Sequence, residues 1–187
     1  MNKIKLFGGI FKGQEILYYS SNVRPTIFII RKILFNWLKD CIIGARVLDI
    51  FGGSGILGFE SISRGASYLL IIEKIDFICK NILLNMKKLN LLNVNLINID
   101  VFKWFDFLKI TKFYIKSFDI IFIDPPYDSN YLFCCLEILL KNNFITKNSY
   151  IYIESYVNYE NEFIYFSYKI FKSRVLGNIR FYIIKKM

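Results

Sequence analysis

The sequence predicts a single α/β domain built on an open, mostly parallel β-sheet. Short and nearly continuous apolar runs, typical of buried parallel strands, recur through the middle of the chain. Amphipathic helical patterns lie between these runs, and such alternation predicts parallel strands joined by right-handed crossovers. At 187 residues the chain is long enough for one well-buried domain and short for two. We therefore expect one domain over residues 1–187.

The expected elements follow one another along the chain. Residues 4–18 predict a β-hairpin and Phe28–Leu38 a helix, so residues 1–40 form an N-terminal extension of the domain. The expected central strands are Arg46–Phe51, Tyr68–Glu73, Val94–Ile99, Phe118–Asp124 and Ser149–Glu154. Helices are predicted over Ile56–Arg64 and along the apolar face formed by Ile75, Ile78, Ile82, Met86 and Leu89. Glu162–Phe171 and Ile179–Lys185 predict two further strands at an antiparallel edge.

The composition excludes several classes of function. The chain has no histidine, which removes Ser-His and Cys-His catalysis and imidazole acid–base chemistry. The cysteines show no CxxC spacing, so we expect no metal site and interpret them as buried free thiols of a reducing cytoplasm; they are Cys41, Cys79, Cys134 and Cys135. Apolar residues make up 55% of the chain, but their runs are shorter than the ~18 residues of a membrane span. Because Met1–Lys5 does not begin a signal peptide, we expect a cytoplasmic protein.

The net charge of +10 is concentrated at the two ends of the chain. Residues 1–40 carry seven basic and two acidic side chains, and residues 169–187 carry six basic side chains and no acid. A nearly neutral middle with two basic ends favours a polyanionic partner. The alternative is that scattered lysines keep an apolar protein soluble.

Acidic residues and glycines lie where ligands bind in an open α/β sheet. The first central run ends in Asp49 and a glycine-rich turn up to Gly55, which opens the next helix. The second run ends in Glu73, 18 residues beyond Gly55, which matches the position of an acid that binds ribose hydroxyls. The third run is followed by Asp100. Each feature alone fits a tight turn or a helix N-cap, and together they indicate an adenosine cofactor, NAD or another.

The motif Asp124-Pro125-Pro126-Tyr127 follows the fourth central run and narrows the chemistry. Two consecutive prolines hold a rigid, extended turn. The Asp124 carboxylate and the Pro125 carbonyl could accept two hydrogen bonds from an exocyclic amine while Tyr127 stacks on the base. Such bonds would localise the amine lone pair and align it with an electrophilic methyl group, which requires no histidine. The alternative is a strand-ending turn with a capping aspartate.

With these motifs, the sequence resembles the RsmD family of S-adenosylmethionine-dependent enzymes, which methylate guanine N2 in bacterial small-subunit ribosomal RNA. The resemblance covers most of the chain and weakens after about Glu154; its clearest segments are Phe7–Gly13, Arg24–Thr26, Arg31–Leu38, Asp49–Glu60 and Ser63–Ala66. It implies a Rossmann-like class I methyltransferase fold with a seven-stranded, mostly parallel sheet and an antiparallel edge. The implied cofactor is S-adenosylmethionine. The implied partner is small-subunit ribosomal RNA or an assembly intermediate of the small subunit. The resemblance also implies a monomer that binds no metal and no membrane.

The resemblance also implies a role for individual residues. Gly53 and Gly55 would approach the methionine part of the cofactor with support from Asp49, Glu73 would hold the ribose, and Asp100 with Val101 would read the adenine. Asp124, Pro125, Pro126 and Tyr127 would hold the target guanine. The implied RNA-binding residues are Lys3, Lys5, Lys12, Arg24, Thr26 and Arg31, of which Arg31 could instead form a salt bridge. Gly52, where the family pattern has a small alanine, and the loosely matching Leu176–Asn178 depart from the family.

Two other functions remain compatible with the sequence. A D/N-PPY turn also occurs in enzymes that methylate adenine N6 in DNA or the side-chain amide of glutamine in proteins. The amino-terminal resemblance and the basic ends favour RNA over these substrates. A catalytically silent RNA-binding assembly factor would keep the same fold, but the intact acids and the DPPY motif argue against it.

Overall fold

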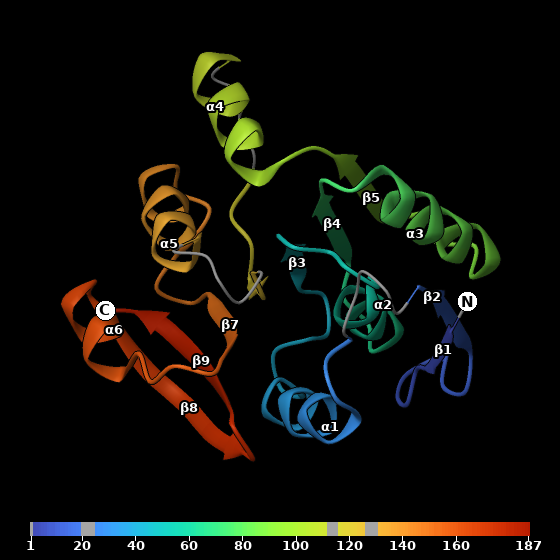
Figure 1. Ribbon diagram of the computed structural model, residues 1–187, viewed down its shortest axis with the longest axis horizontal. Helices are drawn as coiled ribbons and strands as arrows, with labels where there is room; N and C mark the ends of the chain where they lie inside the picture. Colours follow the sequence, from blue (N-terminus) through green and yellow to red (C-terminus); the bar gives the residue numbers. More distant parts are fainter. Residues whose placement is uncertain (1, 20–24, 112–115, 126–130) are drawn as a thin grey trace.

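The central sheet carries the predicted parallel strands. The structure, a computed structural model, describes residues 2–19, 25–111, 116–125 and 131–187. The strands are β3 (Arg46–Asp49), β4 (Tyr68–Glu73), β5 (Val94–Asn98), β6 (Ile120–Ile123), β7 (Tyr150–Ser155), β8 (Tyr168–Leu176) and β9 (Ile179–Lys186). Their spatial order is β5-β4-β3-β6-β7-β9-β8, with β8 and β9 antiparallel to their neighbours (Figure 1). The predicted fold, a seven-stranded, mostly parallel sheet with an antiparallel edge, is confirmed.

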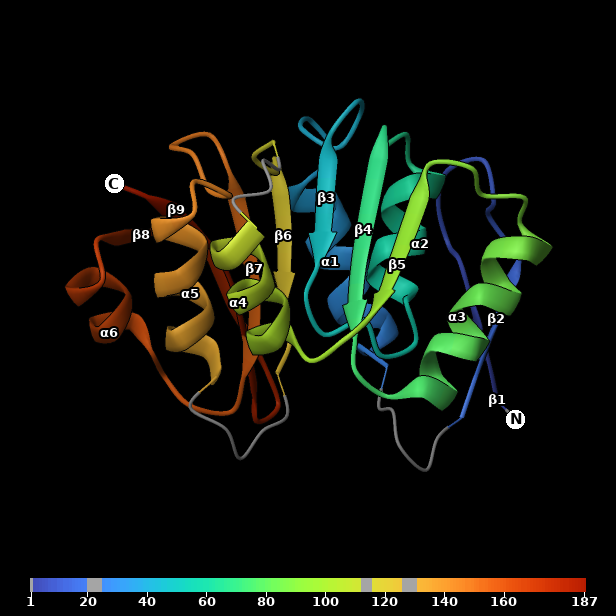
Figure 2. The ribbon, with the colours of Figure 1, turned by 90° about the horizontal axis from the view of Figure 1, so that it is seen from above.

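Helices cover both faces of the sheet and bury two hydrophobic cores. α1 (Phe28–Trp37), α2 (Ile56–Ser63) and α3 (Asp76–Lys88) pack in the first core. α4 (Val101–Thr111), α5 (Tyr131–Lys141) and α6 (Glu160–Tyr165) pack in the second (Figure 2). All four residues of β6 are completely buried, which explains why this strand is apolar at every position.

A separate hairpin at the amino terminus confirms the predicted extension. β1 (Asn2–Lys5) and β2 (Glu15–Tyr18) pair antiparallel. The side-chain amide of Asn85 on α3 donates to and accepts from the backbone of Leu17, both at 2.9 Å. The hairpin is therefore fixed to the helix layer rather than added to the sheet.

The carboxyl-terminal region differs from the prediction in one element. Glu162–Phe171 is predicted as a strand, but the structure has helix α6 over Glu160–Tyr165 and β8 beginning only at Tyr168. Asn158 Oδ1 accepts the N–H of Glu160 at 3.1 Å and so supports the first turn of the helix. Ser167, with a φ of 61°, reverses the chain before β8. The aromatic and apolar residues of this segment suggested a strand, but the Asn158 hydrogen bond and the reversal at Ser167 favour the short helix.

Other expectations concern membrane segments, metals and thiols. Over the described ranges, no helix is long and apolar enough to cross a bilayer. Within the same ranges, no group of three or more potential metal ligands gathers. The four cysteines are free; Cys79 and Cys135 are buried as predicted, whereas Cys134 is exposed on α5.

Candidate active site

The loop between β3 and α2 forms the predicted glycine-rich turn. Gly53 and Gly55 have φ angles of 52° and 73°, in the left-handed region that glycine adopts without steric cost. Gly55 is also the N-cap of α2 and offers no side chain to cap the helix, although Ser54 Oγ accepts the N–H of Ile56 at 3.3 Å. The first turn of α2 thus presents N–H groups and the positive end of its dipole, which suits an anionic group.

Gly52 departs from the family pattern because of its close approach to β4. A Cβ atom at this position would overlap Cγ2 of Ile71, a completely buried side chain. The N–H of Gly52 donates to the carbonyl of Ile72 at 3.0 Å, which keeps the loop against this strand. Glycine therefore fits beside the bulk of Ile71, and alanine would require that side chain to move.

Four acidic side chains face the same side of the sheet at its carboxyl edge. Side chains alternate between the two faces of a sheet along each strand. A residue two positions after a residue of the first core therefore points to the face of the sheet on which that core lies. Counting from Val47, Ile71, Phe122 and Tyr152 of that core, these residues are Asp49, Glu73, Asp124 and Glu154. They come from the four adjacent strands β3, β4, β6 and β7, on both sides of the point where the strand order reverses. Ligands bind at this point in open α/β sheets.

Burial and mutual repulsion raise the pKa of two of these acids. Desolvation raises the pKa of Asp49 to about 8, the charge of Glu73 adds to the shift, and the backbone N–H of Gly58 opposes it. The pKa of Asp124 lies well above its usual value, first because of desolvation and then because of the charges of Glu154 and Asp49. A positively charged ligand would relieve this repulsion, so the site is suited to a cation.

The carboxylate of Glu73 connects β4 to the glycine-rich turn. Its Oε2 accepts the N–H of Gly53 and its Oε1 accepts the N–H of Ile75, both at 2.9 Å. A carboxylate has about four acceptor positions, so two positions can still accept hydroxyl groups. Glu73 is 8% exposed, and ribose binding by this residue stays a prediction.

Asp100 lies at the start of α4 and acts as its N-cap. Its Oδ1 accepts the N–H of Phe102 at 3.0 Å, and its carbonyl accepts the N–H of Trp104 at 2.9 Å. The following residue, Val101, is buried in the second core. The structure thus accounts for Asp100 as a capping residue, and adenine binding by Asp100 and Val101 stays a prediction.

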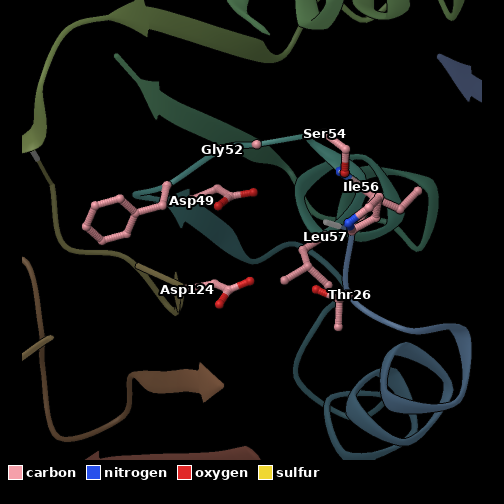
Figure 3. Close-up of a pocket in the computed structure, with 10 residues that line it drawn as sticks. Thr26, Asp49, Gly52, Ser54, Ile56, Leu57 and Asp124 are labelled. Carbon is pink, nitrogen blue, oxygen red and sulfur yellow. The ribbon is translucent and has the colours of Figure 1, made fainter. Parts of the chain in front are cut away.

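A cavity at this edge brings several predicted residues together. Asp49 and Asp124 point into it toward Leu57 and Thr26, which close its other side (Figure 3). Thr26 is 5% exposed and reaches the cavity from the segment that precedes α1. The complete lining is Pro25, Thr26, Asp49, Phe51, Gly52, Gly53, Ser54, Ile56, Leu57 and Asp124. Two strands, the glycine-rich turn and the approach to α1 therefore meet in one small polar site.

Part of the predicted guanine-binding motif can be placed. Asp124 and Pro125 are half-buried directly after β6. Pro126 and Tyr127, like Arg24 of the predicted RNA-binding set, lie outside the described residues. The carboxylate of Asp124 is therefore the described group through which the motif reaches the cavity.

Glu154 is a site residue that the sequence analysis did not select. It is the penultimate residue of β7, is 6% exposed, and accepts a hydrogen bond from the Tyr152 hydroxyl at 3.0 Å. Its charge also raises the pKa of Asp124. The sequence feature that could have identified Glu154 is an acid at the end of a predicted strand, here Ser149–Glu154. The same feature identified Glu73.

The predicted RNA-binding lysines lie on and beside the amino-terminal hairpin. Lys3, Lys5 and Lys12 are exposed, and Lys3 pairs with Glu15 at 2.9 Å. The basic side chains of β8 include the exposed Lys169 and Lys172. The two basic regions lie at opposite ends of the molecule, with the edge of β3 and β6 between them (Figure 1).

The prediction that Arg31 binds RNA is wrong, and the alternative of a salt bridge is correct. The Arg31 side chain is 2% exposed; its Nη1 donates to the Lys5 carbonyl at 3.2 Å and lies 4.0 Å from Glu60 Oε2. Glu60 also binds Arg64 at 2.9 Å and the N–H of Phe7 at 3.0 Å. Arg31 therefore joins α1 and α2 to the hairpin, because its position on the inner face of α1 turns it away from solvent.

We expect Arg31→Ala to lower the free energy of unfolding by roughly 3 kcal/mol, because it breaks a buried ion pair and leaves polar groups uncompensated. The matched control is Lys32→Ala, which removes an exposed cation from the same helix and should change stability by less than about 0.5 kcal/mol. Urea unfolding measures both. An RNA affinity that falls in Arg31→Ala at unchanged stability would contradict the structural role.

Solved structures of other proteins share this fold. A solved structure described as a putative methyltransferase, yhhF, from Escherichia coli superposes with a TM-score of 0.87 and 26% identity, covering 99% of this chain and 98% of that one. A solved putative methyltransferase complexed with SAH has a TM-score of 0.65 and 17% identity, covering 85% of this chain and 50% of that one, a likeness of fold. The fold defines a class I methyltransferase.

The family is shown by the sequence comparisons. The model of the family described as Conserved hypothetical protein 95 matches residues 4–185. Ribosomal RNA small subunit methyltransferase D from Buchnera aphidicola is 40% identical over 149 residues, which are 78% of this chain and 74% of that protein. The chain belongs to the Conserved hypothetical protein 95 family, and the predicted relationship to RsmD-type proteins is confirmed.

Proposed function

We propose that this protein transfers the methyl group of S-adenosylmethionine to the N2 amine of a guanine in bacterial small-subunit ribosomal RNA. The observation that carries the proposal is the position of Asp124, which directly follows β6 and points into a cavity beside Asp49 and the glycine-rich turn (Figure 3). The name of the curated relative supports ribosomal RNA as the substrate. We further infer that the protein acts as a monomer in the cytoplasm, on ribosomal RNA or an assembly intermediate.

The residues of the site fit S-adenosylmethionine. The crowded carboxyls of Asp49 and Asp124 suit a positively charged group, and the uncapped amino end of α2 suits a carboxylate. Glu73 keeps acceptor capacity for ribose hydroxyls beyond its bonds to Gly53 and Ile75. When bound, S-adenosylmethionine supplies an electrophilic methyl carbon on a positively charged sulfur.

The chain's own residues would position the nucleophile. The ionised carboxylate of Asp124 accepts one N–H of the guanine amine, and the carbonyl of Pro125 accepts the other. These two bonds hold the amine and draw its lone pair out of conjugation with the ring, which makes the nitrogen a better nucleophile. The apolar walls at Ile56 and Leu57 exclude water from this contact. The target base must leave its stack to reach the cavity.

Incubation of the protein with labelled S-adenosylmethionine and, separately, small ribosomal subunits, protein-free ribosomal RNA and duplex DNA tests the substrate class. We expect label in ribosomal RNA, and the preferred form of the RNA will indicate when the enzyme acts in assembly. Label in DNA would contradict the proposed RNA substrate and indicate a DNA methyltransferase. Label in none of them, together with measurable binding of S-adenosylmethionine, would contradict the proposal and favour a protein substrate or a silent assembly factor.

The basic hairpin should contribute to RNA affinity through phosphate contacts. We expect the double variant Lys5→Gln, Lys12→Gln to bind ribosomal RNA about tenfold more weakly at low salt, with a shallower salt dependence and unchanged binding of S-adenosylmethionine. Both side chains are exposed on or beside the hairpin. Lys141→Gln, on the exposed side of α5, is the control and should bind normally. An unchanged salt slope in the double variant would remove the hairpin from the RNA interface.

A further inference from the structure

Glu154 stands directly beside the proposed catalytic carboxyl, one strand away. β6 and β7 pair in parallel with Ile123 opposite Ile153, so the next residues, Asp124 and Glu154, are also opposite each other. Both point to the face that carries α1 and α2, because Phe122 and Tyr152 belong to the first core. Neighbouring parallel strands lie about 4.8 Å apart, so the two carboxyl groups share one site.

The position of Glu154 is fixed by its own strand. The hydroxyl of Tyr152, itself 1% exposed, donates to Glu154 Oε2 at 3.0 Å. The Tyr152 ring packs against Phe122 on β6, with ring centroids 6.1 Å apart and an interplanar angle of 79°. A hydroxyl donor favours the charged form of the carboxyl that it binds. The hydrogen bond from Tyr152 therefore holds Glu154 in place next to Asp124.

We propose that Glu154 is a positioning residue that forms a proton-sharing carboxyl pair with Asp124 and thereby sets the pH at which Asp124 accepts a proton from the substrate amine. This role rests on the proposed function. Two close carboxyls in a buried site do not both ionise readily, so one proton is shared between them at moderate pH. The electrostatics of the site agree, since desolvation and then the charge of Glu154 raise the pKa of Asp124.

The pair supplies the proton balance of the transfer. The guanine nitrogen forms a bond to the methyl carbon while the bond from that carbon to the sulfonium sulfur breaks, and its electron pair stays on sulfur. The nitrogen then carries a positive charge and one proton too many. That proton passes along the existing N–H bond direction to the ionised carboxylate of Asp124, so the neutral methylated amine and the neutral thioether leave.

The elements packed around β7 carry other charged side chains, among them Asp49, Arg180, Arg31 and Lys32. Asp49 on β3 faces the same side and adds to the repulsion at Asp124. Arg180 of β9 pairs with Ser155 and influences Tyr182, which belongs to the opposite core. On α1, Arg31 is committed to Glu60 and Lys32 is exposed.

A pH profile of kcat/KM for ribosomal RNA tests the pair. In the wild type we expect the rate to rise with pH as Asp124 ionises. Glu154→Gln removes the neighbouring charge without changing the size of the side chain, so the rising limb should move to lower pH by about one unit, which is about a tenfold faster rate on that limb. Tyr152→Phe should move it in the same direction by less, because it removes the hydroxyl that holds Glu154 beside Asp124. The matched control is Glu137→Gln, a change of an exposed side chain on α5, which should leave the profile unchanged.

A carboxyl ¹³C NMR titration of the ligand-free protein separates this proposal from the proposed function. We expect the Asp124 signal to titrate at lower pH in Glu154→Gln than in the wild type, with Tyr152→Phe as the second variant if Glu154→Gln unfolds. An unchanged titration, or a limb that stays in place, would overturn the pair. Because this titration needs no RNA, it decides on the pair even if the wild type methylates no ribosomal RNA, in which case the proposed function alone fails.

Discussion

Asp124→Ala is expected to reduce methyl transfer by at least about a hundredfold while S-adenosylmethionine affinity stays within about threefold of the wild type. Asp124 lies at the wall of the cavity after β6, where its carboxylate can hold the substrate amine. The cofactor contacts proposed above lie instead on the glycine-rich turn and β4. Single-turnover transfer measures the first effect and calorimetric titration the second.

Stability provides the internal control for Asp124→Ala. The raised pKa of Asp124 means that its charged form is disfavoured by burial and by Glu154 and Asp49, so its removal should not lower the melting temperature. A variant that loses cofactor binding and transfer equally would contradict the separation of roles between β6 and the glycine-rich turn. A variant that keeps full transfer would remove Asp124 from the chemistry.

Glu73→Ala is expected to show the opposite pattern, with S-adenosylmethionine bound at least about tenfold more weakly and transfer at saturating cofactor much less affected. The substitution removes the acceptors of two backbone N–H groups, those of Gly53 and Ile75, and the proposed ribose contact. The glycine-rich turn loses its support in the same step. Cofactor titration followed by transfer assays at several cofactor concentrations separates the two effects.

Two further variants serve as comparisons for Glu73→Ala. Glu73→Gln keeps one carbonyl acceptor, so it should bind the cofactor more tightly than Glu73→Ala. Glu137→Ala removes an exposed glutamate on α5 and should bind normally. Normal cofactor affinity in Glu73→Ala would place the ribose elsewhere and leave Glu73 as a turn-stabilising residue only.

The central strands could be predicted from the sequence because burial on both faces leaves a strong signal. β6, completely buried, is apolar at every position, and the alternation with amphipathic helices determines a parallel sheet. The acids at the strand ends were predictable for the same reason, since the parallel topology places every carboxyl end at one edge. Residues such as Asp49 and Asp124 therefore meet although they are far apart in the chain.

The two wrong predictions, a strand around Phe163 and an RNA contact at Arg31, also have physical causes. Apolar and aromatic residues around Phe163 favoured a strand, whereas this segment is a short helix, supported at Glu160 by the Asn158 side chain, followed by a chain reversal at Ser167. The charge of Arg31 suggested that its side chain is exposed to solvent and binds RNA. Whether an arginine is buried depends, however, on a partner distant in sequence, here Glu60. Such pairings arise only from the tertiary structure.

Glu154 was overlooked for a related reason. Its place at the end of a predicted strand was visible, but its importance depends on the strand order, which puts β7 directly beside β6. Sequence order alone gives no measure of the repulsion between Glu154 and Asp124. The hydrogen bond from Tyr152 likewise depends on the conformation of β7.

The most direct test of the central claim is mass mapping of the nucleosides of ribosomal RNA after reaction with S-adenosylmethionine and the wild-type protein, with Asp124→Ala in parallel. We expect N2-methylguanosine at one position of small-subunit ribosomal RNA with the wild type, and its loss with Asp124→Ala. A methyl group on adenine N6 or on any atom other than guanine N2, or equal methylation by both proteins, would contradict it.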